Sequence, residues 1–402
     1  MIMNKQQIIC IAFPKWEGDY LKSTVQLMKS LSKDYEILYV DYTYTWLDII
    51  RSFLGKKHIP VSRILGLRPR VTNFRIKENQ NVKVLRLPPI IPCNWITNQT
   101  IYQMICTING WFLLPTLKYV MFKHGFRDPL IVNAFQPWLG TFLKGKLGQG
   151  KSIYYCYDEI SAAPWISRHG DATERKFLEK ADHTIVTSTQ LYKTKSKFNS
   201  NISVVKNGVD TDVFSIHQPT VDVNQEKESN SYHRVIGYLG SIDERLDEKL
   251  LTSLIAECKD CQFRFVGRVT DNSIKNSLVK FSNVEFTGPV PPSELPFQVD
   301  RMDVCMIPFK VNPLTAGIYP LKINEYLLRG KPVVSTPFAD LSDFKDLIHI
   351  GKDYDAFKAG IMQVLKEGST PAEIAKRKEF ALGNGWDARA KELKQIFNRL
   401  AS

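Results

Sequence analysis

The sequence has few cysteines, and they form no recognisable pattern. Its 402 residues contain seven cysteines, an odd number, scattered over both halves of the chain. Such scattering does not resemble a disulfide framework, and a reducing compartment fits it best. Cys258 and Cys261 form a lone C-x-x-C without a second pair or a histidine at zinc spacing, so we interpret them as a chance pair.

Long apolar runs are also missing. No window contains the ~18 uninterrupted apolar residues that indicate a membrane-spanning helix. The nearest run, 101–122, is interrupted by Gln103, Asn109, Gly110, Pro115 and Lys118. The N-terminus has one lysine and a short apolar run without a small-residue cleavage site, which indicates a first β-strand and not a signal peptide. We therefore expect a cytoplasmic protein that does not span a membrane.

Acidic residues are scarce in the N-terminal half. Residues 1–217 contain 29 Lys and Arg against 16 Asp and Glu, whereas residues 218–402 contain 25 of each. The entire net charge of +13 therefore lies in the first half. Within it, residues 51–86 hold ten basic residues and the single acid Glu78. A segment of this kind is suited to a polyanion or an anionic lipid surface.

The length predicts two domains, because a single core rarely serves so long a chain. Strand-like and helix-like runs alternate along both halves, as in the βαβ units of a parallel sheet. The predicted strands are 7–13, 35–41, 82–87, 130–133, 152–157, 183–187 and 202–205 in the first half, and 234–240, 262–267, 283–288, 303–308, 332–336 and 347–350 in the second. The predicted class is α/β, with two Rossmann-like, doubly wound domains.

The domain boundary is predicted from a change in composition. Residues 216–233 are polar and almost without periodicity, which is typical of a linker. We therefore predict an N-terminal domain over 1–215 and a C-terminal domain over 234–383. The remaining residues, 384–402, form a predicted amphipathic helix whose apolar side chains need a partner surface.

The stretch from Asn312 to Pro337 combines a loop of small and hydroxyl residues, a short helix and an apolar strand. A loop ahead of a helix N-terminus offers backbone N–H groups and the positive helix end to a phosphate. Lys322 and Glu325 are three residues apart and therefore share one helix face. The ammonium could face a diphosphate while the carboxylate accepts hydrogen bonds from a ribose. The alternative is an exposed ion pair on a helix packed against a sheet.

Several motifs accompany this stretch. Residues 204–210 read V-V-K-N-G-V-D and are followed by Phe214. The other motifs are 235–243, 286–290 with Glu294 and Leu295, 303–309, 312–315, and 320–322 with 325–327. Together they resemble the GT-B glycosyltransferases, and within these the retaining family 4 enzymes (glycosyl transferases group 1) of teichuronic-acid and other surface-polysaccharide biosynthesis. The similarity covers most of the second domain and the first only loosely.

The resemblance implies two domains that face each other across a cleft. It places the acceptor in the first domain and a nucleotide-diphosphate sugar in the second, and it implies that the C-terminal helix crosses back to the first. Glu325 is implied as the ribose-binding carboxylate. The other residues implied in nucleotide-sugar binding are Gly240, Arg268, Val290, Thr315, Ala316, Gly317 and Ile318.

Two departures from the family pattern concern the donor site. Many members carry a second glutamate eight residues before the first, where this chain has Gly317. Backbone groups of residues 315–318 could replace it. The family's diphosphate-binding Arg and Lys are also out of register, and Arg245 is the nearest candidate, followed by Lys249, Arg268 and Lys322. A guanidinium suits a bidentate phosphate contact, and a surface arginine is the alternative.

Sugar transfer from such a donor requires the expulsion of a nucleotide diphosphate. Catalysis would then be mostly electrostatic, with Lys322, Arg245 and a helix N-terminus stabilising the leaving group. This chemistry requires neither a cofactor nor a metal, and we find no D-x-D-like cluster beside a predicted strand.

Acceptor-site candidates follow predicted strands of the first domain, where ligands bind in open α/β sheets. Asp158 could position the acceptor hydroxyl or take its proton, and Glu159 stands beside it; capping of the next turn is the alternative. His169 is a further acceptor candidate, with a surface histidine as the alternative. In the first loop, Trp16 could stack on a sugar and Gly18 could allow close approach of a ligand.

The basic first half suggests a further partner. Six apolar residues from Trp46 to Leu54 interleave with Arg51, Lys56 and Lys57, which resembles an interfacial segment on an anionic bilayer. A solvated face with a buried apolar stripe is the alternative. We do not expect nucleic acid as a partner, because no nucleic-acid-binding motif accompanies the charge.

Our prediction is therefore a nucleotide-sugar-dependent glycosyltransferase acting on a glycan or lipid-linked glycan, at the inner face of the membrane, and the resemblance implies that it is retaining. The alternatives are a non-catalytic relative that binds sugar nucleotides or glycans and another GT-B enzyme such as an epimerase. The sequence leaves open the donor base and sugar, the acceptor, the linkage and the oligomeric state.

Overall fold

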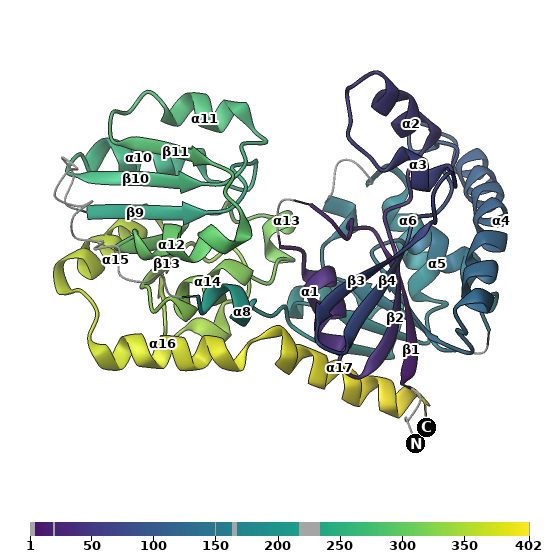
Figure 1. Ribbon diagram of the computed structural model, residues 1–402. Coiled ribbons are helices and arrows are strands. Elements are labelled where there is room, and N and C mark those ends of the chain that lie inside the picture. Colours follow the sequence, from purple (N-terminus) through teal and green to yellow (C-terminus); the bar gives the residue numbers. More distant parts are fainter. Residues whose placement is uncertain (1–4, 19–20, 149, 163–166, 217–233, 402) are drawn as a thin grey trace. The chain divides into compact units, whose positions relative to one another are not determined.

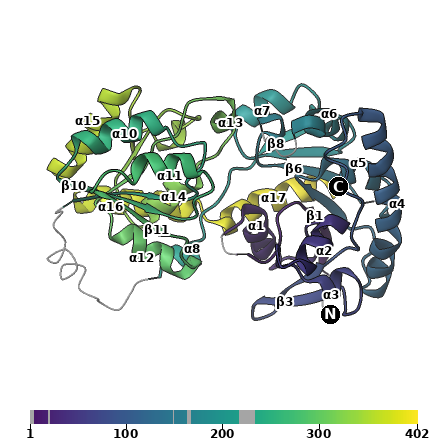
Figure 2. The same ribbon diagram turned by 90° about the horizontal axis from the view of Figure 1, so that it is seen from above.

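The computed structural model describes residues 5–18, 21–148, 150–162, 167–216 and 234–401. The chain divides into two compact units, which we call unit 1 (residues 1–206 and 390–402) and unit 2 (residues 207–389). Each unit is built around one β-sheet that helices cover (Figures 1 and 2). The predicted α/β class with two mainly parallel sheets is confirmed.

The sheet of unit 1 has eight strands in the order β3-β4-β2-β1-β5-β6-β7-β8. All neighbouring strands are parallel except β3 and β4, which form an antiparallel hairpin at one edge. The strands are β1 (Gln6–Ala12), β2 (Tyr35–Val40), β3 (Val71–Lys77), β4 (Gln80–Leu85), β5 (Leu130–Ala134), β6 (Ser152–Cys156), β7 (His183–Val186) and β8 (Ile202–Val204). Each strand predicted in this half is present, and β3 is an additional strand.

The helices of unit 1 pack on this sheet through apolar faces. They are α1 (Ser23–Leu31), α2 (Trp46–Phe53), α3 (Val61–Ile64), α4 (Gln99–Lys123), α5 (Pro137–Leu143), α6 (Ser167–Leu178) and α7 (Thr189–Lys195). The largest core cluster joins β1, β2 and β4 to one face of α4, where Leu113 and Leu117 are fully buried. Among the described residues, α4 alone is long and apolar enough to be a candidate membrane span, and 39% of its most apolar window is buried.

Unit 2 has a six-stranded, parallel sheet in the order β11-β10-β9-β12-β13-β14. Its strands are β9 (Arg234–Leu239), β10 (Cys261–Val266), β11 (Val284–Gly288), β12 (Val304–Ile307), β13 (Val333–Ser335) and β14 (His349–Ile350). Its helices are α8 (Thr211–Phe214), α10 (Glu248–Glu257), α11 (Asn272–Leu278), α12 (Leu295–Asp300), α13 (Pro313–Ala316), α14 (Leu321–Leu328), α15 (Tyr354–Glu367) and α16 (Pro371–Gly383). From β9 the chain first adds β10 and β11 on one side of the sheet and then adds β12, β13 and β14 on the other. The strand order therefore reverses beside β9.

The first boundary lies earlier than the predicted residue 215. Val209 forms a parallel bridge with Gly385, and the carbonyl of Phe214 accepts a hydrogen bond from Arg329 at 2.9 Å. These contacts make residues 207–216 part of unit 2. The predicted linker, 216–233, lies outside the described residues apart from Ile216.

The last helix, α17 (Trp386–Ala401), has its C-terminal part in unit 1. There the ring of Phe397 packs edge-on against Tyr35, with ring centroids 5.9 Å apart. Lys394 and Asp34 form an ion pair at 2.8 Å. The apolar face of this helix is therefore buried against unit 1.

All seven cysteines are free and buried, including Cys258 and Cys261, so the prediction that they form no disulfide framework is confirmed. Within the described ranges, no group of three or more His, Cys, Asp or Glu side chains could hold a metal ion.

Candidate functional site

Three loops of unit 2 meet at the carboxyl edge of its sheet, where open α/β sheets bind ligands. They follow β9, β10 and β12, and short backbone bridges tie them together. Ile242 pairs with Val269, and Leu246 pairs with Phe309. The amide of Ile242 also donates to the carbonyl of Arg268 at 2.9 Å. The loops therefore form one connected surface ahead of helix α14.

Helix α14 carries Lys322 and Glu325 on one face, and the predicted helix is confirmed. The Lys322 side chain crosses the backbone of Gly240, whose φ is +147°. A Cβ atom at position 240 would lie 2.2 Å from Lys322 Cε and 2.8 Å from its Nζ. A Cβ at Gly267 would in turn lie 2.1 Å from the carbonyl oxygen of Gly240. Because neither glycine has a side chain, the end of β9 can pack directly against the end of β10 and against the Lys322 side chain.

Aromatic rings hold the two cations of the site. Lys322 Nζ lies 5.7 Å from the ring centroid of Tyr238 and 5.6 Å from that of Phe309. The guanidinium of Arg245 lies 5.4 Å from the centroid of Phe309. Both cations therefore share one ring. We call Tyr238, Gly240, Arg245, Phe309, Lys322 and Glu325 the lysine–arginine site.

Arg245 is fixed in place by its neighbour Asp243. Its Nε donates to Asp243 Oδ1 at 2.8 Å, and its backbone N–H donates to the same oxygen at 3.2 Å. The carbonyl of Arg245 accepts from Lys310 N at 2.8 Å, which ties it to the loop after β12. The guanidinium is therefore pre-oriented, as bidentate phosphate binding requires.

Burial perturbs both ionisable groups of α14. The pKa of Lys322 is lowered to about 8, first by burial and then by the positive charge of Arg245. The pKa of Glu325 is raised to about 7 by burial, an effect that Lys322 opposes and Asp210 strengthens. An anion between the two cations would offset the repulsion from Arg245, which is the second cause of the low lysine pKa after burial.

Asp210 is a site residue that the sequence analysis left without a role. It belongs to the N-G-V-D motif, and its carboxylate accepts from Val213 N at 3.0 Å as the N-cap of α8. Its charge also acts on Glu325. The N-G-V-D motif marks Asp210 in the sequence, but only the fold shows that this residue lies near Glu325 of helix α14.

The loop before α14 is built by its own side chains. Thr315 is fully buried, and its hydroxyl donates to the carbonyl of Lys310 at 2.6 Å. Its N–H donates to Asn312 Oδ1 at 3.0 Å. The N–H groups of Ala316, Gly317 and Ile318 also have partners within the loop. The Thr315 side chain therefore shapes the loop, and a contact of the backbone groups of residues 315–318 with the donor stays a prediction.

The remaining donor-site candidates lie farther along the same edge. Arg268 follows β10 and has an exposed side chain. Val290 follows β11, and the amide of Gly267 donates to Gly288 at 2.9 Å, which joins these two loops. The structure thus places Arg268 and Val290 at the sheet edge that carries the lysine–arginine site.

In unit 1, the carboxyl end of β6 carries the predicted acceptor-site acids. Asp158 is exposed there. Glu159 instead forms an ion pair with Lys195 at 2.6 Å, and Lys195 pairs with the buried Glu174 at 2.8 Å. Burial opposes the charge on Lys195, but Glu174 and Glu159 outweigh it, so the lysine pKa is raised. Glu159 therefore belongs to a buried ion-pair network, which is a structural role in place of the predicted acceptor contact.

His169 is neither an acceptor contact nor a surface residue. It lies on α6, is 5% exposed and stacks on Tyr102 with ring centroids 4.0 Å apart. One ring nitrogen is hydrogen-bonded to Gln99, and the other lies 2.6 Å from the carbonyl oxygen of Ile96. Both nitrogens are thus occupied by the segment that begins α4. The predicted acceptor role is wrong for this reason.

The first loop also differs from its prediction. Trp16 is 7% exposed, because its ring packs on Tyr39 and Phe74 with centroids 5.0 Å and 5.7 Å apart. It offers no open face to a sugar. Gly18 has a φ of +150°, and a Cβ there would lie 2.5 Å from Nζ of Lys22. The protein's own lysine therefore occupies the space that we predicted for a ligand.

The sequence analysis missed a cation–aromatic group at the same edge of unit 1. Lys15 Nζ lies 5.4 Å from the ring centroid of Tyr44 and 5.9 Å from that of Tyr42. Lys57 lies 5.9 Å from the ring of Tyr44 and is also paired with Asp48. The pKa of Lys15 is lowered by burial and then by the charge of Lys57. The signal available was the D-Y-T-Y sequence directly after β2.

Comparison with known proteins covers both units. Residues 233–367 match the family model described as glycosyl transferases group 1. The chain is similar to TuaH of Bacillus subtilis (strain 168), a candidate teichuronic acid biosynthesis glycosyltransferase, with 28% identity over 265 residues. The match covers 61% of this chain and 62% of that relative, which is less than two thirds of its length.

Three solved structures have a similar fold. The sucrose-phosphate synthase of Thermosynechococcus elongatus has a TM-score of 0.71 at 17% identity, over 99% of this chain and 100% of that one. Anabaena HepE, in complex with UDP and glucose, has a TM-score of 0.65 at 14% identity, over 98% and 100%. The catalytic domain of Arabidopsis thaliana starch synthase IV, bound to ADP and acarbose, has a TM-score of 0.65 at 10% identity, over 99% of each chain. At these identities the likeness establishes the fold alone.

Proposed function

We infer that this chain, which has the GT-B fold and whose residues 233–367 belong to the glycosyl transferases group 1 family, transfers a sugar from a nucleotide diphosphate sugar to an acceptor. The donor would bind at the lysine–arginine site of unit 2. The observation that carries this inference is the Lys322 side chain laid across Gly240, with Glu325 on the same face of α14 and Arg245 on the same aromatic ring.

Each group of the site would have a distinct task. Lys322 and Arg245 would neutralise the charge that develops on the departing diphosphate, which is the largest electrostatic demand of the reaction. Glu325, on the same face of α14 as Lys322, would accept hydrogen bonds from the ribose. Asp158 of unit 1 would orient the acceptor hydroxyl or take its proton. This scheme requires neither a metal nor a cofactor.

The acceptor and the biological role rest on weaker support. The likeness to TuaH favours a glycan or lipid-linked glycan acceptor and a part in cell-surface polysaccharide synthesis on the cytoplasmic side. Retention of anomeric configuration is supported by the motifs at residues 204–214 and 312–327. The related structures hold UDP or ADP, so they leave the donor base open.

The test is a thermal-shift panel of UDP, GDP, ADP and TDP with their sugar conjugates. A ligand that binds only the folded state raises the melting temperature by mass action. We expect one diphosphate to stand out in the wild type and to lose its effect in Glu325→Ala. The matched control is Glu379→Ala, an exposed glutamate on α16, which should keep the full shift. The absence of any shift at millimolar nucleotide would refute the proposal.

A non-catalytic binding protein is the second candidate, because the buried Gly317 stands where the family resemblance implies a donor-contacting glutamate. The two functions differ in turnover. An enzyme should hydrolyse its donor slowly even without an acceptor, and this hydrolysis should disappear in Arg245→Ala. Tight nucleotide binding without hydrolysis or transfer would favour the binding protein.

A further inference from the structure

Helix α4 exposes a continuous stripe of large apolar side chains. Seven of them lie along a single face at spacings of one to seven residues, and their exposed fractions run from 45% for Ile101 to 87% for Phe122. We call this set the outer stripe: Ile101, Met104, Ile108, Trp111, Phe112, Tyr119 and Phe122. A helix on a protein surface normally turns polar residues toward water. The outer stripe therefore indicates a surface that meets a partner.

The opposite face of α4 is firmly attached to unit 1. Leu113 and Leu117 are fully buried in the main core cluster with β1, β2 and β4. In the middle of the helix, the buried Asn109 exchanges two 3.0 Å hydrogen bonds with the backbone of Ile91. Lifting the helix out of the fold would break this packing. The helix is therefore placed to lie along a surface with one face inserted, and not to cross a bilayer.

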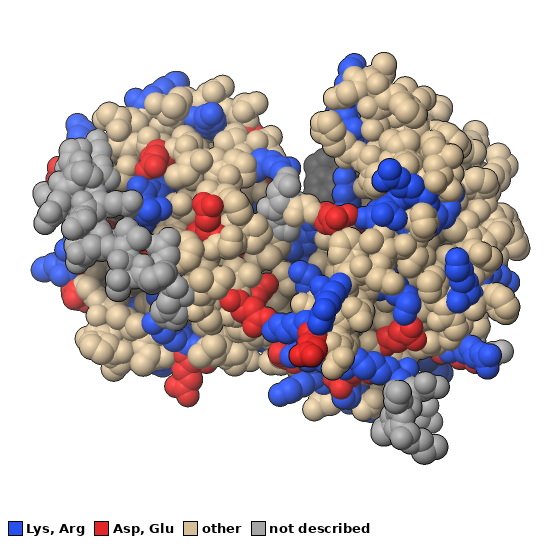
Figure 3. All heavy atoms as spheres, viewed as in Figure 1, with Lys and Arg blue, Asp and Glu red and all other residues tan. Residues whose placement is uncertain are grey.

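Positive charge accompanies the outer stripe. No Asp or Glu occurs between Glu78 and Asp128, and α4 itself contains Lys118 and Lys123 near its C-terminal end. Figure 3 shows that the visible surface over α4 consists mainly of uncharged residues, with Lys and Arg toward its lower end. An apolar band with basic residues beside it is the composition of interfacial, membrane-bound surfaces.

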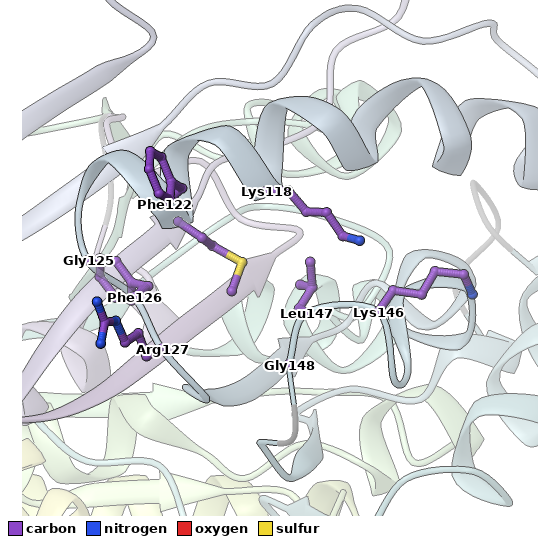
Figure 4. Close-up of a pocket in the computed structure, with 9 residues that line it drawn as sticks. Lys118, Phe122, Gly125, Phe126, Arg127, Lys146, Leu147 and Gly148 are labelled. Atoms are coloured by element: carbon purple, nitrogen blue, oxygen red, sulfur yellow. The ribbon is translucent and has the colours of Figure 1, made fainter.

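A cavity at the C-terminal end of α4 gathers these cations. Its volume is about 380 Å³, and three basic side chains line it: Lys118, Arg127 and Lys146 (Figure 4). The rest of the lining is apolar or glycine and includes Phe122 of the outer stripe. Asp128, beside Gly148, is an acid near the rim. A cavity with three cations and an apolar wall suits a phosphate that is attached to an acyl chain.

The cavity and the outer stripe are physically continuous. Lys146 Nζ donates to the carbonyl of Phe142 at 2.6 Å and lies 4.6 Å from the centroid of that ring. The Phe142 ring in turn packs edge-on against Trp111, with centroids 5.3 Å apart. A ligand in the cavity would therefore touch the same surface that Trp111 and Phe122 present.

A second surface of unit 1 has the same composition. Helix α2 exposes Ile50 and Phe53, at 54% and 73%, beside Arg51. The amide of Trp46, its first residue, donates to the carbonyl of Ile90, next to the Ile91 that pairs with α4. The exposed apolar residues that we predicted at Trp46–Leu54 are thus linked to the outer stripe through residues 90 and 91.

We propose that α4 is the membrane-docking element of this protein, in which the outer stripe enters the interface of an anionic bilayer and Lys118, Arg127 and Lys146 bind a lipid phosphate. A second copy of the chain would be a less suitable partner for this surface than an anionic bilayer. A two-fold contact through this face would bring basic groups of the two copies toward one another, and such like-charge contacts disfavour association. An anionic lipid surface supplies the complementary charge. This inference does not depend on the proposed sugar transfer.

The experiment is flotation of the full-length protein with vesicles of phosphatidylcholine alone and of phosphatidylcholine with phosphatidylglycerol. We expect binding to the anionic vesicles only. Trp111→Gln with Phe122→Gln should abolish it. Lys118→Gln with Lys146→Gln should weaken it about twenty-five-fold, at about fivefold for each charge removed.

Matched variants separate these effects from general ones. Lys176→Gln with Lys180→Gln removes the same charge from exposed positions on α6 and just beyond its end, and Val279→Gln with Met362→Gln changes exposed apolar residues of unit 2. Both should bind vesicles like the wild type. Unchanged circular dichroism and an unchanged melting temperature show that the α4 variants are folded. The proposal would be overturned by equal binding to neutral vesicles or by no binding to either kind. It would also be overturned if the protein were a dimer that only the variant Trp111→Gln with Phe122→Gln dissociates.

Discussion

The side chain of Lys322 passes over residue 240 at a distance that only glycine allows, because a Cβ there would lie 2.2 Å from Lys322 Cε. Gly240→Ala should therefore displace the ammonium from the site. We expect nucleotide affinity to fall at least tenfold, or ~1.4 kcal/mol, as measured by titration calorimetry. Gly368→Ala is the control, since its φ is also positive, at +71°, but the space around the new Cβ is open. Equal losses in both variants would contradict the packing argument.

Nucleotide affinity should depend on pH through Lys322. Its pKa is lowered to about 8, so the free protein loses this positive charge as the pH rises from 7 to 9. Because the diphosphate binds the ammonium form, affinity should decline across this window by up to about tenfold per pH unit above 8. Titration calorimetry at constant ionic strength measures it. Lys322→Arg, which stays charged, should lose the decline above pH 8 and keep only the smaller decline near pH 7 that ionisation of Glu325 causes, even if its affinity is lower.

Arg245 should matter more for turnover than for binding. The proposed role is to stabilise charge that develops on the leaving diphosphate, so Arg245→Gln should lower kcat by about a hundredfold or more, with a smaller change in nucleotide Kd. Asp243→Asn removes the charge of the ion pair but keeps an oxygen that can accept a hydrogen bond from the guanidinium, and should cost less. A purely structural arginine would instead lower the melting temperature and leave the kcat of the folded protein unchanged.

The network around Lys195 should control stability and not acceptor binding. Lys195 and Glu174 are both almost fully buried, so Lys195→Met leaves a buried carboxylate without its partner and should cost about 3 to 5 kcal/mol of unfolding free energy. Denaturant titration measures this. Glu159→Gln keeps the Lys195–Glu174 pair and should cost much less. A raised acceptor KM in Glu159→Gln at unchanged stability would restore its predicted acceptor role.

His169 and Asp158 should show opposite behaviour. His169→Ala removes two buried hydrogen bonds and the stacking on Tyr102, and should lower the unfolding free energy by about 2 to 3 kcal/mol. The kcat of the remaining folded enzyme should not change. Asp158→Asn alters an exposed carboxylate and should leave stability unchanged while slowing transfer. A loss of kcat in folded His169→Ala would show that the histidine acts on the acceptor after all.

The antiparallel edge strand β3 shows one limit of the sequence analysis. Its sequence, V-T-N-F-R-I-K, alternates as a half-buried strand does, and Asn79 in the turn after it has a φ of 60°. It lies within the basic segment 51–86, whose ten Lys and Arg residues indicate polyanion binding and mask this alternation. Edge strands carry such charges because their outer face meets water. The alternation that predicts a strand was present in the sequence, but the basic residues were interpreted only as a charged surface.

Local pattern was sufficient wherever neighbouring residues decide the structure. The parallel strands, the helix that carries Lys322 and Glu325 and the concentration of charge in unit 1 all follow from spacing and composition within short windows. Tertiary structure alone decided what depends on contacts between distant residues. In the folded chain Trp16 is buried against Phe74, and Glu159 is paired with Lys195. His169 is hydrogen-bonded to Ile96 and Gln99, and the outer stripe of α4 is exposed to water. The physical reason is that the burial of a side chain depends on which strands and helices pack beside it, and no short window of sequence contains that information.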